Sequence, residues 1–495
     1  MKQKNWFKPK AFTHISQKLS IEDGQWIKNY VSNPANIRNH RFYPLIHRTI
    51  VLKRFKKSED RRGNTSKRHY TIKNGKRIAN VKYREIYYPN HLDAHIYSYY
   101  TQKILEPLYE SELKQNKILN EAVLAYRRIP LTDNSRCKCN IDFANDVFDK
   151  IEKSKGDVAV LALDISKFFD SLDHKILKQA WVNLLGRKDL ETDHYNIFKS
   201  LTNFSYVEMK SLLNEFGYRH PNELIQKEVQ CFITNGKEFR DRIKSKGYIK
   251  SNPFRRIDID KNGNEIKKTI GIPQGTPISA FLANLYLLEF DKKALSLLKE
   301  CNGAYRRYSD DILLICPKEI HESIAEKFYE LIKEFKLTIQ PSKTQCSFFV
   351  NGRLAKGEKP VGYLGLQFDG KRKLLRSASI SKFYRKMKAN VKYRAFQASR
   401  SKLVGGNKTI DSTLHRKKLY TQFSFLGASN KSFRKRNYFS YANFAARITK
   451  SSHINKQLSN AWKILHDEIA KHEERYNLTK IENKKNSKSP FTTKI

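Results

Sequence analysis

The chain has 495 residues, with 96 Lys or Arg against 49 Asp or Glu, and therefore a formal net charge of +47. Hydrophobic residues make up 39% of it and aromatic residues 12%, a content that supports a packed core and excludes a fully disordered chain. No apolar run approaches the roughly 20 residues of a membrane span, and six scattered cysteines do not form a disulfide framework. We therefore expect a cytoplasmic protein in a reducing environment, with no membrane partner.

The positive charge is concentrated in two stretches of the chain. Residues 48–84 carry 14 basic and 2 acidic residues, and residues 371–410 carry 13 basic residues and no acidic one. Everything after Gly370 has a net charge of +25, which is over half of the total. Clustered Lys and Arg interleaved with Tyr and Phe indicate a polyanionic partner, and nucleic acid is the first candidate.

The first half of the chain predicts helices around one buried strand. Residues 92–110 have helical periodicity, which we expect Pro107 to close. The apolar run at 157–165 (DVAVLALDI) predicts a buried strand. A helix over 166–185, capped by Ser166, is expected to follow, and then a mixed, mostly helical region over 186–250.

The second half predicts hairpins, two long helices and a basic helical end. Gly405-Gly406 is expected to interrupt that last region, and the residues from about 482 are expected to be disordered. The other predicted elements are a hairpin over 254–272 that turns at 262–263, a helix over 277–297 begun by Pro277, a strand–turn–strand over 304–316, an amphipathic helix over 321–335 and a strand over 361–368.

Aspartates stand out within the predicted strands. Asp310 and Asp311 interrupt an apolar hairpin, and the alternative to a functional role is an ordinary exposed turn. Asp164 ends the apolar strand, and Asp170 follows as a simple helix cap. If the strands lie side by side, Asp164 and Asp310 converge, and two carboxylates held that close require divalent cations between them. A pair of Mg²⁺ ions about 4 Å apart would suit phosphoryl transfer.

Taken together, the short motifs of this chain resemble those of the reverse transcriptases. The order of its motifs is the order in that family, over roughly residues 80–370. The matching segments are 82–84 (KYR) and 125–128 (AYRR) in the fingers, 164–170 (DISKFFD), 271–279 (GIPQGTPIS) and 308–311 (YSDD) in the palm, 337–343 (LTIQPSK), and 361–368 (VGYLGLQF) at the primer grip.

The resemblance implies roles for the acids and for a basic residue. Asp164 and Asp310 would hold two Mg²⁺ ions with help from the backbone carbonyl of Ile165, and Asp311 would be a weaker third acid. Lys343 would protonate the leaving pyrophosphate.

The resemblance also implies substrate contacts. Phe169 would exclude the 2′-hydroxyl of an NTP, with core packing as the alternative. Gln274 would touch the nascent base pair. Arg127 would clamp the triphosphate, a role that Arg128 or Lys82 could share, although a solvated surface charge is the alternative.

Two further sets of residues complete the site predictions. Tyr363, Leu364 and Gly365 would hold the primer end. Cys137 and Cys139 are too close in sequence for the usual zinc knuckle, and we interpret them as structural thiols.

The implied fold is an α+β right-hand polymerase, with fingers, a palm on an antiparallel sheet, a helical thumb and a basic helical C-terminal extension. The expected domains are a basic N-terminal extension over 1–80, fingers and palm over 81–370 with an insertion over about 186–270, a basic helical thumb and C-terminal region over 371–480, and a disordered tail over 481–495.

Within that family, the chain is similar to stand-alone bacterial reverse transcriptases of the unknown groups, related to retron and group II intron enzymes. The resemblance implies an RNA-directed DNA polymerase that uses dNTPs and a dedicated noncoding RNA, makes a DNA product and acts in antiphage defence. The insertion over about 186–270 would serve either RNA binding or self-association into a homo-oligomer. The alternatives are template-independent or protein-primed homopolymer synthesis, retron-type synthesis of DNA linked to RNA, and a catalytically idle RNA-binding scaffold.

Overall fold

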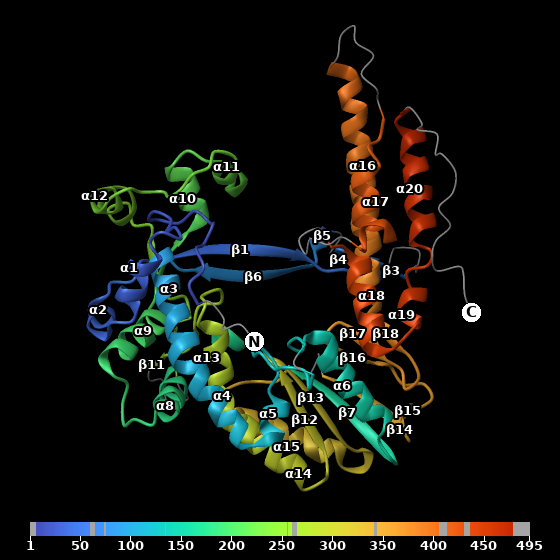
Figure 1. Cartoon of the computed structure of the whole chain (residues 1–495), viewed down its shortest axis with the longest axis horizontal. Helices are drawn as coiled ribbons and strands as arrows, with labels where there is room; N and C mark the ends of the chain where they lie inside the picture. Colours follow the sequence, from blue (N-terminus) through green and yellow to red (C-terminus); the bar gives the residue numbers. More distant parts are fainter. Residues whose placement is uncertain are drawn as a thin grey trace. The chain divides into compact units, whose positions relative to one another are not determined.

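The computed structural model describes residues 6–59, 65–73, 76–133, 135–254, 256–259, 265–340, 344–404, 413–429 and 436–478. The chain forms two compact units (Figure 1). Unit 1 comprises Met1–Arg127, Ala162–Leu313 and Glu322–Thr344, and unit 2 comprises Arg128–Leu161, Leu314–His321 and Gln345–Ile495. No helix in the described ranges is long and apolar enough to cross a membrane.

Unit 1 contains a four-stranded sheet in the order β6-β1-β8-β9. The two longest strands, β1 and β6, pair antiparallel from Ile46–Tyr88 to Lys53–Val81 and form an extended ribbon (Figure 1). Buried apolar residues of β1, β8 and α10, including Ile46, Val207 and Leu212, form one core cluster. The strands are β1 (Leu45–Lys53), β6 (Val81–Tyr88), β8 (Ser205–Glu208) and β9 (Ile249–Ser251), and the smaller hairpins are β2 (Lys56–Glu59) with β3 (Thr65–Arg68), β4 (Tyr70–Lys73) with β5 (Lys76–Ala79), and β10 (Arg256–Ile259) with β11 (Glu265–Lys268).

The helices of unit 1 lie around these strands. They are α1 (Gly24–Val31), α2 (Pro34–Asn39), α3 (His91–Tyr99), a π-helical turn (Tyr100–Leu105), α4 (Glu106–Gln115), α5 (Lys117–Ala122), α7 (Phe168–Ser171), α8 (His174–Leu185), α9 (Thr192–Thr202), α10 (Met209–Glu215), α11 (Pro221–Gln226), α12 (Gly236–Phe239), a second π-helical turn (Arg240–Lys244), α13 (Ser279–Tyr286), α14 (Leu288–Lys299) and α15 (His321–Glu334).

A five-stranded sheet has the order β12-β13-β7-β14-β15. Its middle strand is the apolar run that the sequence predicted to be buried. The strands are β7 (Asp157–Asp164), β12 (Ala304–Tyr308), β13 (Asp311–Pro317), β14 (Gln345–Val350) and β15 (Arg353–Leu354). In unit 1, α14 lies against β12 (Figure 1). Lys293 of α14 forms an ion pair with Glu334 of α15.

Unit 2 combines a small sheet with a group of helices. In the three-stranded sheet β16-β17-β18 both neighbouring pairs are antiparallel. Helices α16 and α20 run alongside each other in Figure 1. The elements are α6 (Asn140–Glu152), a 3₁₀ turn (Lys318–Ile320), β16 (Val361–Tyr363), β17 (Leu366–Phe368), β18 (Lys373–Leu375), α16 (Ser377–Val404), α17 (Lys417–Phe423), a 3₁₀ turn (Phe425–Gly427), α18 (Tyr438–Thr449), α19 (His453–Lys456) and α20 (Ala461–Arg475).

Most predicted elements are observed, but several predicted helices are divided. The helix expected over 166–185 with a Ser166 cap is wrong at its start, because Asp173 accepts from the N–H groups of Lys175 and Ile176 and begins a new helix, α8. Pro107 does not close the helix over 92–110; it lies in the first turn of α4, which follows the π-helical turn Tyr100–Leu105 without a break.

Three other predictions concern helix ends and turns. The helix expected over 277–297 breaks at Leu287 into α13 and α14, and the strand expected over 361–368 is a hairpin of β16 and β17. The expected break at Gly405-Gly406, the turn at 262–263 and the tail after residue 478 lie outside the described residues.

Candidate active site

The two predicted metal-binding aspartates lie on adjacent chain segments in unit 1. Asp164 is the last residue of β7, and Asp310 lies in the turn between β12 and β13. The N–H of Ile165 donates to the carbonyl oxygen of Asp310 at 3.1 Å, so the strand ends meet at these residues. Asp164 and Asp310 are half-buried, and Asp311 is exposed. The convergence expected from the sequence is therefore present in the backbone.

A third segment holds Asp164 from its other side. The N–H of Gln340 donates to the carbonyl oxygen of Asp164 at 2.9 Å, and the N–H of Ser166 donates to Thr338 at 2.8 Å. Ile165, which lies between them, forms an antiparallel bridge with Ile339. The backbone of the first acid is thus fixed on both sides.

The turn that carries Asp310 has an unusual backbone conformation. Ser309 has φ of 60°, in the left-handed region that is costly for a residue with a side chain. Its hydroxyl is 3.1 Å from the hydroxyl of Tyr126, and its carbonyl oxygen accepts from Arg307 at 3.3 Å. These contacts stabilise the turn in the conformation that places Asp310 beside Ile165.

Arg307 is a buried support of this turn that the sequence did not reveal. Its side chain and that of Asp291 are 0% exposed, and they form a two-pronged ion pair at 2.7 and 2.5 Å. Although burial lowers it, the attraction of Asp291 raises the pKa of Arg307 above its ordinary value, so the guanidinium stays charged. Tyr305 also donates to Asp291, at 2.5 Å. One signal in the sequence could have indicated this pair. Arg307 lies two residues after Tyr305 in a predicted buried strand, so the two side chains share a face and the arginine requires a buried acid as its partner.

Asn284 extends this buried network to the loop before Tyr126. Its side-chain oxygen accepts from Arg307 at 3.0 Å, and its amide nitrogen donates to Ala125 at 2.8 Å. The N–H of Leu124 donates to the carbonyl oxygen of Arg307 at 2.9 Å. Helices α13 and α14, strand β12 and the loop at residues 124–126 therefore hold one another in place around the turn.

Phe169 and the loop predicted to contact the nascent base pair also meet in unit 1. The N–H of Ile272 donates to the carbonyl oxygen of Phe169 at 2.9 Å. Phe168 is buried at 4% exposure and serves as core packing, whereas Phe169 is only half-buried. The partial exposure of Phe169 fits the predicted contact with a sugar better than the core alternative.

The loop that carries Gln274 is held against β6. The carbonyl oxygen of Gln274 accepts from the N–H of Tyr87 at 2.8 Å. Gly275 has φ of +125°, and a Cβ atom there would lie 2.7 Å from the carbonyl oxygen of Tyr87. Only glycine permits this approach, which leaves the half-buried side chain of Gln274 at the surface of the loop.

Arg127 does not have the environment expected of a triphosphate clamp. Its side chain is 3% exposed, and it forms a two-pronged ion pair with Glu110, at 2.8 Å for both bonds. Its remaining N–H groups donate to Asn120 and Val123, so all five guanidinium donors are used within unit 1. In this arrangement Arg127 stabilises the loop that follows α5, and none of its N–H groups is free to donate to a phosphate.

The other predicted site residues have different surroundings. Lys82 and Arg128 are exposed. Leu364 and Gly365, with φ of 46° and 93°, form the tight turn of the β16–β17 hairpin, and Tyr363 is buried in β16. Lys343 lies outside the described residues.

The carboxylates suit a hard divalent cation. Among the described residues no three His, Cys, Asp or Glu side chains form a cluster that could hold a metal by itself. Mg²⁺ in phosphoryl-transfer sites, however, is usually held by one or two carboxylates and completes its shell with water and substrate phosphates. The pair Asp164 and Asp310 provides this type of donor set.

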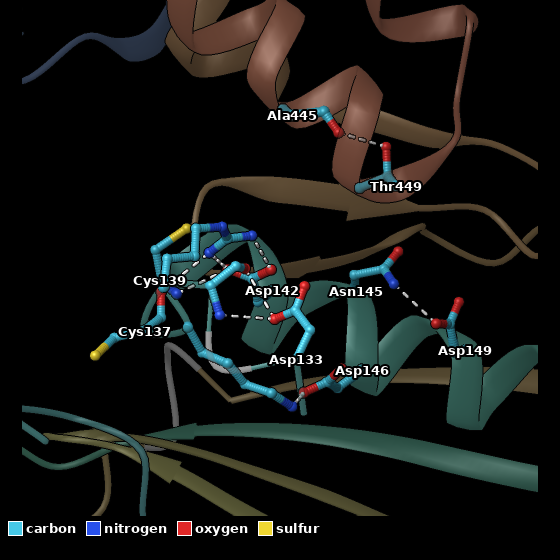
Figure 2. Close-up of polar contacts among 12 residues, drawn as sticks. Asp133, Cys137, Cys139, Asp142, Asn145, Asp146, Asp149, Ala445 and Thr449 are labelled. Atoms are coloured by element: carbon cyan, nitrogen blue, oxygen red, sulfur yellow. Dashed lines mark hydrogen bonds and ion pairs between the residues drawn. The ribbon is translucent and has the colours of Figure 1, made fainter. Parts of the chain in front are cut away.

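The Cys137–Cys139 pair lies at the start of α6 and has a structural explanation. Figure 2 shows the two sulfur atoms pointing in different directions beside Asp142. The N–H of Cys139 donates to Asp142 at 2.8 Å, which caps the helix, and Arg136 holds the same carboxylate with bonds of 2.7 and 2.6 Å. Burial raises the pKa of the Cys139 thiol, which disfavours the thiolate that a metal would need.

Comparison with known proteins identifies the family. Residues 80–368, more than half of the chain, match the reverse transcriptase (RNA-dependent DNA polymerase) family. The chain therefore belongs to that family. The match confirms the predicted right-hand polymerase fold and the predicted enzyme class, an RNA-directed DNA polymerase.

The chain is also similar to solved telomerase structures at low identity. One is apo telomerase from Candida tropicalis truncated from its C-terminal domain, with 11% identity, a TM-score of 0.35, and coverage of 70% of this chain and 58% of that chain. Another is telomerase from Candida albicans in complex with the TWJ fragment of telomeric RNA, with 11% identity, a TM-score of 0.36, and coverage of 91% and 66%. The chain thus spans less than two thirds of each of them. No curated protein matches it.

Proposed function

We propose that this reverse transcriptase extends a DNA 3′-hydroxyl, or a protein hydroxyl, with dNTPs on an associated noncoding RNA, in the cytoplasm and in antiphage defence. The observation that supports the catalytic part is the hydrogen bond from the N–H of Ile165 to the carbonyl oxygen of Asp310, which joins the backbones of the two segments that carry these half-buried acids. The net charge of +47 supports an RNA partner.

The proposed chemistry is two-metal phosphoryl transfer. Bound Mg²⁺ would activate the attacking hydroxyl and stabilise the leaving pyrophosphate. Asp164 and Asp310 would hold the ions, with the carbonyl oxygen of Ile165 as a further ligand, and the exposed Asp311 would position water or metal. Gln274 would contact the nascent pair, Lys343 would donate the proton to pyrophosphate, and exposed Arg128 and Lys82 would attract the triphosphate.

The test of the function is whether the product sequence follows an RNA template. Purified protein is given a DNA primer annealed to RNAs of defined, different sequence, with all four dNTPs and Mg²⁺, and the products are sequenced. Products complementary to each RNA are expected. A homopolymer independent of the RNA would instead establish the template-independent alternative.

The Phe169→Ala variant should accept ribonucleotides. Truncating the half-buried ring removes the group proposed to collide with a 2′-hydroxyl, and we expect the preference for dNTP over rNTP to fall at least about tenfold, or roughly 1.4 kcal/mol. The measurement is the ratio of kcat/KM for dGTP and GTP. Phe168→Ala is the matched control; loss of stability with an unchanged ratio is expected there. If the ratio is unchanged in Phe169→Ala, the ring of Phe169 contributes only to core packing and does not select the sugar.

A further inference from the structure

A large pocket lies within unit 2, among α16, α17 and the start of α18. Its volume is about 1120 Å³, at the upper end of the range of small-molecule sites and large enough for more than one nucleotide. The residues that line it are Ser379, Lys382, Phe383, Lys386, Lys417, Lys418, Thr421, Gln422, Phe423, Arg436, Asn437, Tyr438 and Tyr441.

The rim of the pocket is strongly basic. Lys382 and Lys386 of α16 and Lys417 and Lys418 of α17 are exposed, and Arg436 adds a fifth cation, with no acid in the lining. Within the described ranges no carboxylate forms an ion pair with any of these four lysines. Four lysines without an ion pair in the described part of the chain, gathered on one concave surface, attract an anion, and together they attract a chain of phosphates.

Aromatic rings line the same pocket. Phe383 and Tyr438 are stacked, with centroids 4.9 Å apart and planes inclined by 20°, and Tyr441 lies 5.9 Å from Tyr438. The hydroxyl of Tyr438 is buried and has no hydrogen-bond partner in the described part of the chain. Burial raises the pKa of Tyr438 to about 12, so this hydroxyl stays neutral at physiological pH and the ring adds no negative charge to the pocket.

The start of α18 adds a site for negative charge. Tyr438 is the first residue of this twelve-residue helix, and the side chain of Asn437 caps it by accepting from Ser440. The N-terminus of a helix carries a partial positive charge and favours phosphate. Cations, aromatic side chains and a helix N-terminus therefore converge on one pocket.

We infer that this pocket binds a single-stranded segment of nucleic acid, with phosphates on the lysines and at least one base against the rings. Duplex nucleic acid hides its base faces, so only an unpaired base can use the aromatic part of the site. An acidic peptide would satisfy the lysines and leave the rings unused. The inference deepens the proposed function, since a polymerase that copies a long RNA must also hold its unpaired part.

Binding of unstructured oligonucleotides tests the inference. Labelled oligo-uridylate and oligo-thymidylate are titrated with full-length protein in EDTA and without dNTPs, at several salt concentrations. In the Lys382→Ala/Lys386→Ala double variant, the slope of log affinity against log salt should fall by about 1.4, from two lost phosphate contacts. Tyr438→Leu should weaken binding about tenfold at one salt concentration, and Tyr438→Phe should weaken it less.

The matched controls lie outside the pocket in the same unit. Lys463→Ala/Lys471→Ala changes two exposed lysines of α20, and Tyr393→Leu changes a tyrosine of α16 that is 61% exposed; neither should alter the affinity comparably. If the pocket variants weaken the binding of oligo-uridylate alone, the site is specific for RNA. If they weaken the binding of both oligonucleotides equally, the site accepts single-stranded RNA and single-stranded DNA alike. A labelled RNA–DNA duplex of the same length is titrated in parallel. If the pocket variants weaken its binding as much as that of the single strands, or if no pocket variant weakens single-strand binding, the inference is overturned.

The same experiment separates this inference from the proposed function. Because binding is measured without metal or dNTPs, it does not depend on polymerisation. Primer extension by the unaltered protein, measured in parallel, tests the proposed function. Extension with unaffected oligonucleotide binding in the variants would remove the pocket assignment only, and weakened binding without any extension would remove the polymerase proposal only.

Discussion

The Asp310→Asn variant should lose dNTP incorporation by at least about a thousandfold, or roughly 4 kcal/mol of transition-state stabilisation. Asparagine keeps the shape of the side chain, while the charge that holds the divalent cation is removed. The backbone bond between Ile165 and Asp310 does not involve the substituted group, so the fold should persist. The measurement is primer extension at saturating dNTP, with circular dichroism as the check of folding.

Further variants make this result specific. Asp164→Asn should lose as much activity as Asp310→Asn, and the double variant should lose little more, because the two acids act as one unit. The exposed Asp311 should give a smaller loss on the same change. Asp467→Asn, at an exposed position of α20, is the matched control and should be fully active. RNA affinity should not fall in any of them, and retained synthesis in Asp310→Asn would refute the assignment of the site.

The sequence predicted the centre of this site because its signals are local. An apolar run ending in Asp164 and a second apolar pair interrupted at Asp310 each indicate a buried strand, and buried strands tend to pair. The register that joins Ile165 to Asp310 follows once the strands are neighbours. Motif order then identified the family without any knowledge of the register.

What the sequence did not show depends on which side chains become partners. Residue type alone does not distinguish Arg127 or Arg307 from the many other basic residues of the chain. Folding pairs Arg127 with Glu110 and Arg307 with Asp291, and neither pairing has a signature in spacing. The predicted start of one helix was wrong for a similar reason. Asp173 and Ser166 are both suitable N-cap residues, and only the folded structure shows that Asp173 begins the helix.

Arg307→Met should destabilise the protein by about 3–5 kcal/mol, because it leaves the fully buried carboxylate of Asp291 without its cation. Methionine roughly matches the volume of the arginine, so the loss reflects an unpaired charge rather than a cavity. The measurement is the free energy of unfolding in urea. Lys293→Met, which breaks an exposed ion pair with Glu334, is the matched control and should cost no more than about 1 kcal/mol.

The double variant Arg307→Met/Asp291→Leu separates stability from the positioning of the turn that carries Asp310. Removing both charges should restore most of the stability, because no buried charge is left alone. The carbonyl oxygen of Ser309 still lacks its bond from Arg307, so the turn that carries Asp310 is less well fixed. We therefore expect kcat to remain about tenfold or more below the unaltered protein with little change in KM for dNTP. If kcat recovers fully together with stability, Arg307 contributes only to the stability of the fold and does not position the turn.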